Sequence, residues 1–124
     1  MKGFVTDIEK ATKTNVNYRK VVYTAKHMQL VLMRLCPGES IGAEVHPDTD
    51  QFFRFESGVG VVTINGVNHK VGSGSVVIVP CGAKHNVTNT STTYLKLYTI
   101  YTPPEHKDGV VQRTKQDQEV KPRK

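Results

Sequence analysis

The chain has 124 residues, of which 37% are hydrophobic, and it carries a formal net charge of +6. This length fits one domain with a single buried core, and no apolar run approaches the roughly eighteen residues that a membrane span requires. The basic surplus lies in the two terminal arms, because residues 27–104 contain equal numbers of acidic and basic side chains. No basic stripe with interleaved aromatic residues is present, so we expect neither a nucleic acid nor a membrane as a partner.

Two cysteines, Cys36 and Cys81, form no motif with each other. The first residues of the chain also lack the apolar stretch of a secretory signal peptide. Free thiols without an export signal are typical of a reducing compartment. The sequence therefore predicts a cytoplasmic protein.

The two ends of the chain differ from its middle. Thr6 to Glu9 has the Ser/Thr-x-x-Glu form of a capping box, which predicts a short helix with Phe4 packed against it as a hydrophobic staple. From Glu105 onward the sequence is polar, and we expect it to wrap the surface or fray at its end. The expected single domain, 1–124, thus comprises an N-terminal arm (1–18), a barrel (about 19–104) and a polar tail (105–124).

Between these arms, segments rich in β-branched and aromatic residues alternate with turn signals at nearly regular spacing. Asn65-Gly66 is the strongest hairpin signal and is typical of a two-residue type I′ turn. The run 75–79 is almost continuously apolar, which predicts a buried strand. The pattern predicts an all-β barrel or sandwich with strands at 19–25, 28–35, 41–46, 51–56, 61–64, 67–71, 75–79, 85–89 and 94–101.

Four polar side chains in this pattern are spaced as metal ligands. Glu44 and His46 are two residues apart in a predicted strand, so they face the same side. Gln51 begins the next strand after a short turn, and His85 begins another after a Pro/Gly loop. Carboxylate, imidazole and amide donors suit Fe(II), Mn(II), Ni(II), Co(II) or Zn(II) and leave positions open for water or substrate. The sequence therefore predicts one divalent ion held by Glu44, His46, Gln51 and His85.

Two stretches, 38–58 and 74–89, resemble the paired motifs of the cupin superfamily. The first stretch has the spacing of its motif from Gly38 to Gly58, with His46 as the second histidine. The resemblance implies a double-stranded β-helix, or jelly-roll, in a small single-domain cupin similar to mannose-6-phosphate isomerase-like cupins. The second stretch matches its motif without exception, at Gly74, Pro80, Gly82, His85 and Asn89.

The ligand set departs from the usual cupin set of three histidines and one glutamate. Glu44 stands where the first histidine is expected, and Gln51 stands where the glutamate is expected. Compared with the usual set, the single carboxylate stands at position 44 instead of position 51. The total ligand charge therefore stays at minus one, which favours retained metal binding. Because an amide oxygen is a weak ligand, Gln51 can instead be a hydrogen-bond partner of a three-ligand site. Asp48 and Asp50 are interpreted as loop-capping acids, although either one can replace Gln51 as a ligand.

Other side chains have structural interpretations. Phe53 and Phe55 are assigned to the barrel core rather than to a substrate-stacking surface, and the Cys81 thiol is assigned a structural role. The Pro-Pro-Glu-His segment, 103–106, can fold over the mouth of the barrel. Otherwise, we interpret the histidines without partners in the sequence as surface residues: His27, His69 and His106.

Cupins with such sites include isomerases, dioxygenases, decarboxylases, lyases and non-catalytic sugar-binding modules. The resemblance implies a metal-dependent enzyme of the isomerase, dioxygenase or lyase type that acts on a sugar, keto-enol or hydroxy acid, with Glu44 as the catalytic proton carrier. The alternative is a non-enzymatic ligand-binding or regulatory cupin, because a fold alone does not choose a chemistry. The strand at 28–35 is apolar on both faces, which further predicts a homodimer.

Overall fold

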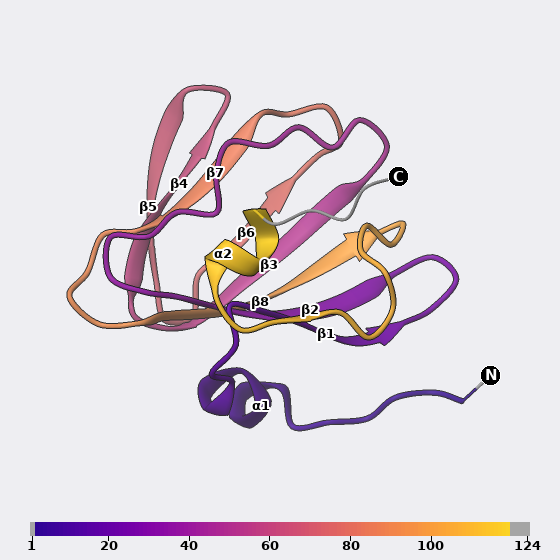
Figure 1. Cartoon of the computed structure of the whole chain (residues 1–124). Helices are drawn as coiled ribbons and strands as arrows, with labels where there is room; N and C mark the ends of the chain where they lie inside the picture. Colours follow the sequence, from indigo (N-terminus) through magenta and orange to yellow (C-terminus); the bar gives the residue numbers. More distant parts are fainter. Residues whose placement is uncertain (1, 120–124) are drawn as a thin grey trace.

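Residues 2–119 are described in the computed structural model, where they form two antiparallel β-sheets that face each other (Figure 1). The larger sheet has six strands in the order β6-β3-β8-β2-β1-β9, and the smaller has three in the order β5-β4-β7. This arrangement confirms the predicted all-β jelly-roll with a short N-terminal helix. The strands are β1 (Arg19–Thr24), β2 (Gln29–Leu35), β3 (Asp50–Ser57), β4 (Val59–Ile64), β5 (Val67–Gly72), β6 (Val76–Val79), β7 (His85–Asn89), β8 (Leu95–Thr102) and β9 (Val111–Gln112).

The core lies between the two sheets. Side chains two residues apart along each strand of the larger sheet point into it, as the period of a β-strand requires. Phe53 and Phe55 belong to this core, as predicted, and stack with ring centroids 6.2 Å apart. The remaining large, fully buried apolar side chains include Val31, Met33, Leu35, Val62, Val87, Leu95 and Leu97.

Two turns between strands depend on glycine. Asn65 and Gly66 both have positive φ, 48° and 84°, which confirms the type I′ hairpin between β4 and β5. Gly58 ends the first motif with φ of 90°, and a Cβ atom there would collide with the carbonyl oxygen of Tyr94. Only glycine fits that position, because it needs both the left-handed backbone and the close approach to β8.

Two predicted strands differ from the structure. Residues 41–46 form no regular strand, because Gly42 adopts φ of 107° and interrupts the extended run. The predicted buried strand at 75–79 is β6, which lies at the edge of the larger sheet. Its Val76 and Ile78 are 48% and 65% exposed, so only one face of the apolar run packs on the core. Apolar composition alone did not show whether the second face is covered.

The N-terminal helix, α1 (Ile8–Thr14), packs against the outer face of the larger sheet (Figure 1). Its N-cap is Asp7, whose carboxylate accepts a hydrogen bond from the backbone of Lys10, and not Thr6 as the capping-box pattern predicted. Phe4 stacks on Tyr23 of β1, with ring centroids 5.3 Å apart, instead of stapling the helix.

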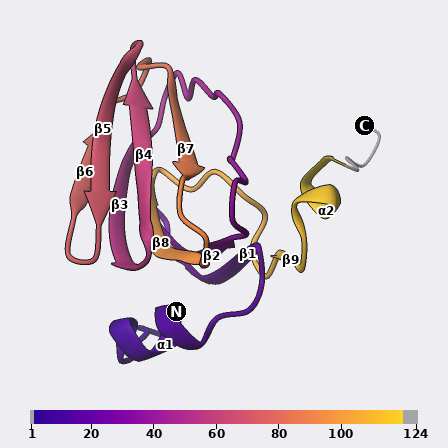
Figure 2. The ribbon, with the colours of Figure 1, turned by 90° about the vertical axis from the view of Figure 1, so that its left-hand side faces the viewer.

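The C-terminal segment wraps back onto the larger sheet. Strand β9 pairs with β1, and the short helix α2 (Lys115–Glu119) follows it, on the open side of the molecule next to the loop between β2 and β3 (Figure 2). Residues 120–124 of the predicted polar tail lie outside the described residues.

Within residues 2–119, neither helix is long and apolar enough to cross a membrane. Both cysteines, Cys36 and Cys81, are free and exposed.

Candidate metal centre

The loop that joins β2 to β3 carries Glu44 and His46 alongside β7. Glu44 exchanges two backbone hydrogen bonds with His85, the first residue of β7, with N···O distances of 2.8 and 2.9 Å. Residues paired in this way project their side chains to the same face. Residues 41–46 therefore place Glu44 and His46 beside His85, as the sequence predicted, although they do not form a regular strand.

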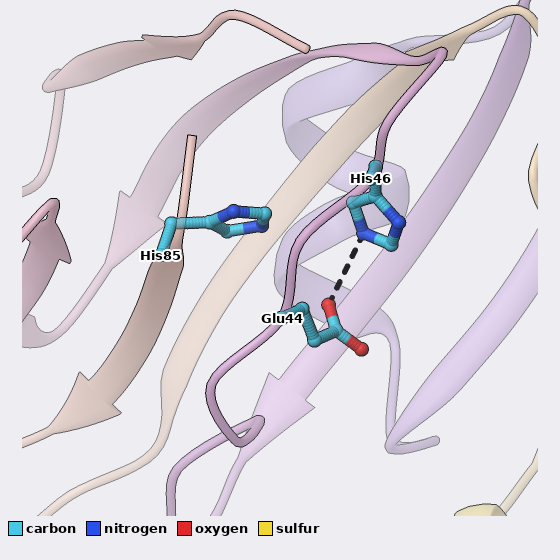
Figure 3. A group of neighbouring side chains, drawn as sticks. All are labelled: Glu44, His46 and His85. Carbon is cyan, nitrogen blue, oxygen red and sulfur yellow. Dashed lines mark ion pairs between the residues drawn. The ribbon is translucent and has the colours of Figure 1, made fainter. Parts of the chain in front are cut away.

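Glu44, His46 and His85 converge on one point (Figure 3). One ligand atom from each side chain lies within 4.8 Å of the others. The two imidazole rings have centroids 5.4 Å apart, and Nε2 of His46 is 3.3 Å from Oε1 of Glu44. The side chains of His46 and Glu44 are 12% and 31% exposed, so solvent reaches the cluster from one side while His85 is buried.

An acceptor oxygen lies near Nδ1 of each histidine. Nδ1 of His85 is 3.1 Å from the carbonyl oxygen of Ala83, and Nδ1 of His46 is 3.4 Å from Oε2 of Glu105. Because a carbonyl or a carboxylate oxygen only accepts, Nδ1 carries the proton in each neutral ring. The lone pair on Nε2 then faces the cluster, which is the usual arrangement of a metal-binding histidine with a supporting acceptor.

Gln51 lies inside the barrel on β3, where it pairs with Tyr101 of β8. Its Nε2 donates a hydrogen bond to Oγ1 of Thr99 at 2.9 Å. Its Oε1 has no hydrogen-bond partner. The structure places Gln51 two residues from Phe53, whose ring is 6.1 Å from that of His85. The compact cluster consists of Glu44, His46 and His85, and direct ligation by Gln51 stays a prediction.

The donor atoms that a metal ion needs are left without partners in this structure. Nε2 of His85 and Oε1 of Gln51 are buried and have no hydrogen-bond partner, and the buried Nε2 of His46 faces only Oε1 of Glu44, at 3.3 Å. Buried polar atoms are almost always paired, because an unpaired one loses its hydration without compensation. The two histidine nitrogens converge with the Glu44 carboxylate, and these three donors fit a divalent ion.

Electrostatics at the cluster favour a positive charge between Glu44 and His46. Burial alone would raise the pKa of Glu44, but the hydrogen bond and charge of His46 and the charges of Arg19 and His85 outweigh it and lower that pKa. The hydrogen bond that protonated His46 donates to the Glu44 carboxylate, with the charges of Glu44 and Glu105, raises the pKa of His46 against the effect of burial. Either a proton or a metal ion can supply the positive charge that this pair holds.

The C-terminal segment supplies residues that the motifs did not indicate. Glu105 contacts His46, and His106 Nε2 is 3.3 Å from the hydroxyl of Tyr101. Buried Gln29 fixes this segment, because its amide oxygen accepts hydrogen bonds from the backbones of Glu105 and His106. The surface assignment of His106 was therefore wrong, and the alternative in which the Pro-Pro-Glu-His segment folds over the barrel is the one observed.

Burial shifts the pKa values of His106 and Tyr101. It lowers the pKa of His106 to about 4, and the charge of Arg19 acts in the same direction. It also raises the pKa of Tyr101, which stays neutral. The other two histidines, His27 and His69, are exposed as predicted.

The two loop acids are outside the cluster in this structure. Asp50 accepts a hydrogen bond from the backbone of Cys81 at 2.8 Å, as expected of a loop-capping acid. Asp48 is exposed and does not belong to the group of possible ligands.

Comparisons with known proteins agree with the fold and the motifs. The model of the cupin domain family matches residues 31–101. A Bacillus subtilis protein, the uncharacterised protein YrkC, is 46% identical over 122 residues, which are 94% of this chain and 66% of that protein. The chain thus spans slightly less than two thirds of that relative. A mimivirus protein, the uncharacterised protein L612, is 42% identical over 87% of this chain and 70% of its own length.

Solved structures show the same architecture. The crystal structure of BH2720 from Bacillus halodurans has a TM-score of 0.95 and 39% identity, and it covers 97% of this chain and 96% of its own. A predicted oxalate decarboxylase from Thermotoga maritima has a TM-score of 0.61 and 26% identity, over 64% of this chain and 69% of its own.

Proposed function

Because this chain belongs to the cupin family and carries a cluster of unpaired donor atoms, we propose that it is a metal-dependent enzyme acting on a small oxygenated molecule. The substrate classes are a sugar, a keto-enol or a hydroxy acid, and the reaction classes are isomerase, dioxygenase or lyase. The observation that carries the proposal is the convergence of Glu44, His46 and His85, with ligand atoms within 4.8 Å of one another and the Nε2 atom of each histidine buried. The similarity to mannose-6-phosphate isomerase stays a prediction.

Glu44, His46 and His85 would hold the ion, and the amide oxygen of Gln51 would be a fourth donor. Fe, Mn, Ni, Co and Zn all suit this set of oxygen and nitrogen donors. When bound, such an ion supplies a Lewis acid that polarises substrate oxygens. The exposed side of Glu44 and His46 leaves room for the substrate to reach it.

Glu44 is the candidate proton carrier. It has two carboxylate oxygens and is the most exposed member of the cluster, so one oxygen can bind the ion while the other exchanges a proton with the substrate. Glu105 holds His46 in place from the side of Nδ1, and is thus a positioning residue. Phe53 and Tyr101 surround the two histidines with aromatic rings and exclude water from the buried side.

The second candidate function is a non-enzymatic ligand-binding or regulatory cupin. The exchanged ligand set favours it, since an amide in place of a carboxylate at Gln51 makes a weaker metal site. Such a protein would keep the barrel and bind a small molecule without converting it.

One experiment separates these functions. The protein is purified without chelator and its metal content is measured. It is then incubated with a panel of keto-enols, sugars and hydroxy acids while oxygen uptake and the exchange of substrate C–H protons with deuterated water are followed. We expect about one divalent ion per chain and turnover of at least one class, both lost in Glu44→Gln. Bound metal with no turnover across the panel would favour the binding protein, and absence of metal in the parent would contradict the metal-dependent enzyme.

A further inference from the structure

A buried cation lies on the inner face of the larger sheet, outside the cluster of metal ligands. Arg19, the first residue of β1, pairs with the fully buried Met33 and therefore points to the same side of the sheet. It is only 2% exposed. A guanidinium stays charged at any physiological pH, so its burial is unfavourable unless an anion compensates it.

The partners of Arg19 are neutral. Its Nη1 donates hydrogen bonds to the amide oxygens of Gln112 and Gln118, at 2.8 and 2.9 Å, and its buried Nε has no acceptor. No carboxylate among the side chains that the structure describes forms an ion pair with it. Arg19 therefore has a full positive charge that amide dipoles solvate but do not neutralise.

A second donor converges on the same oxygen. The hydroxyl of Tyr18 donates to Oε1 of Gln118 at 2.6 Å, so one amide oxygen accepts from a phenol and from a guanidinium. Burial raises the pKa of Tyr18 to about 12, which keeps this hydroxyl protonated as a donor. Donors arranged in this way would bind a carboxylate oxygen more strongly than an amide oxygen, because the hydrogen bonds become charge-assisted.

The group that fills this place is carried by a short helix. Gln118 belongs to α2, a helix of five residues that follows the two-residue strand β9. Its Nε2 donates to the carbonyl oxygen of Ile41 at 3.3 Å, three residues before Glu44. The Gln118 amide thus lies between Arg19 and the loop that carries the metal ligands, and a short helix can move away from it at small energetic expense.

We propose that Arg19 and Tyr18 bind the carboxylate of a small hydroxy acid or oxo acid, in the place that the Gln118 amide takes in this structure. The assignment rests on the proposed function for the other end of the ligand, whose oxygens would reach the cluster of Glu44, His46 and His85. Since Nη1 makes the contact with the Gln118 oxygen, a bidentate contact with a carboxylate would use the fork of Nη1 and Nη2. One guanidinium matches a monoanion, whereas a phosphate dianion would bring a second charge that no described neighbour compensates.

Binding is tested on chelator-treated full-length protein, so that the outcome does not depend on metal. Glycolate is titrated against isotope-labelled protein by nuclear magnetic resonance, with glycolamide as the neutral analogue and inorganic phosphate as the alternative anion. We expect saturable shifts at Tyr18, Arg19 and Gln118 with glycolate and none with glycolamide. Gln118→Ala should tighten glycolate binding at least about threefold, because the competing amide is removed.

The variant Gln118→Glu provides a second measurement that needs no ligand. Its carboxylate would take the proposed position, so we expect the midpoint of thermal unfolding to rise by about 3–6 °C and the affinity for glycolate to fall at least about tenfold. Gln116→Glu is the matched control, since it makes the same charge change at an exposed position of the same helix. It should leave both quantities unchanged.

Equal responses to glycolate and glycolamide in the parent and in Gln118→Ala would overturn the proposal, as would a Gln118→Glu variant no more stable than Gln116→Glu. Tighter binding of phosphate than of glycolate would overturn the choice of a carboxylate. Glycolate binding to a protein that takes up no metal would support the anion site and refute the metal-dependent enzyme, so the two proposals fail separately.

Discussion

The two faces of the six-stranded sheet are both rich in apolar side chains, but the chain covers the inner face more completely than the outer one. On the inner face Met33, Phe55 and Leu97 pair across β2, β3 and β8 and are completely buried under the smaller sheet. On the outer face a row formed by Leu30, Ile100, Phe52 and Ile78 crosses from β2 to the edge strand β6. Helix α1 covers only part of that face, and Ile78 is 65% exposed.

This difference teaches that hydrophobic periodicity identifies the faces of a strand but not what covers them. The inner face also contains buried polar exceptions, among them Arg19 and Gln51, while the cluster of Glu44, His46 and His85 is carried by the loop between β2 and β3 and by β7 of the smaller sheet. The outer face has no such cluster among the described residues. We therefore expect changes on the inner face to affect stability and metal binding, and changes on the outer face to affect association.

The largest effect is expected at Phe55. Replacing this completely buried ring with alanine should lower the free energy of unfolding by about 3–5 kcal/mol, because a cavity remains next to Phe53. The matched control is Phe52→Ala, which removes the same ring from the half-buried outer face and should lower it by less than half as much. Urea unfolding measures both. Equal losses would show that the outer face is covered as completely as the inner one.

The next effect concerns metal affinity. Glu44→Gln keeps the shape of the cluster and removes its only carboxylate, so we expect divalent ions to bind about 100-fold more weakly. Gln51→Glu should have the opposite effect, because it adds a carboxylate where an unpaired amide oxygen now lies. Calorimetry and elemental analysis measure both variants, with circular dichroism to verify folding. Parent-like affinity in Glu44→Gln would mean that Glu44 is not a ligand.

Local spacing was sufficient to predict that three of the candidate ligands converge. Glu44, His46 and His85 converge as expected because the pairing of one loop with one strand brings them together, and the Gly/Pro turns that permit this pairing are visible in the sequence. The regular strand expected at 41–46 did not form, since Gly42 turns the backbone away from the extended region. The convergence of these three side chains was predicted correctly even though this local conformation was not.

Contacts between distant segments could not be predicted in the same way. Glu105 reaches His46 and Gln118 reaches Arg19 only after the C-terminal segment folds back over the sheet. No period or spacing relates residues so far apart along the chain. Polar residues such as these resemble an exposed tail until the tertiary structure assigns them partners.

The buried position of His106 in the C-terminal segment predicts a pH dependence. The pKa of His106 is about 4 in the folded protein and 6.5 in its ordinary state. Between these values the unfolded chain binds more protons than the folded one, so stability should fall as the pH is lowered from 6.5 towards 4. The full difference corresponds to about 3 kcal/mol, and partial exposure of the ring reduces our expectation to about 1–2 kcal/mol.

The measurement is urea unfolding across this pH range, in the presence of chelator. His106→Gln should lose that part of the pH dependence, while the exposed His69→Gln should retain the curve of the parent. Parent and His106→Gln curves that stay parallel from pH 7 to pH 4 would refute a buried, neutral His106.

The smallest effect on stability, and the largest on association, is expected at the outer face. The homodimer was first predicted from the apolar strand at 28–35 as an edge strand, but β2 lies inside the sheet between β8 and β1. The edge strand β6 exposes Val76 and Ile78, of which Ile78 pairs with Phe52 at the end of the outer row. An unpaired apolar edge promotes association, and two copies that meet on this face would bury it symmetrically.

We therefore expect the parent to be a dimer at micromolar concentration by light scattering. Ile78→Lys should make it monomeric, with a change of less than about 0.5 kcal/mol in the stability of each subunit, since the substituted side chain is already exposed. Val67→Lys is the control, because Val67 is similarly exposed but lies on β5 of the other sheet. A monomeric parent, or equal effects of the two substitutions, would contradict association through this face. In that case the outer row would be a solvent-facing surface, and the contrast between the two faces would lie only in how far the chain itself covers each one.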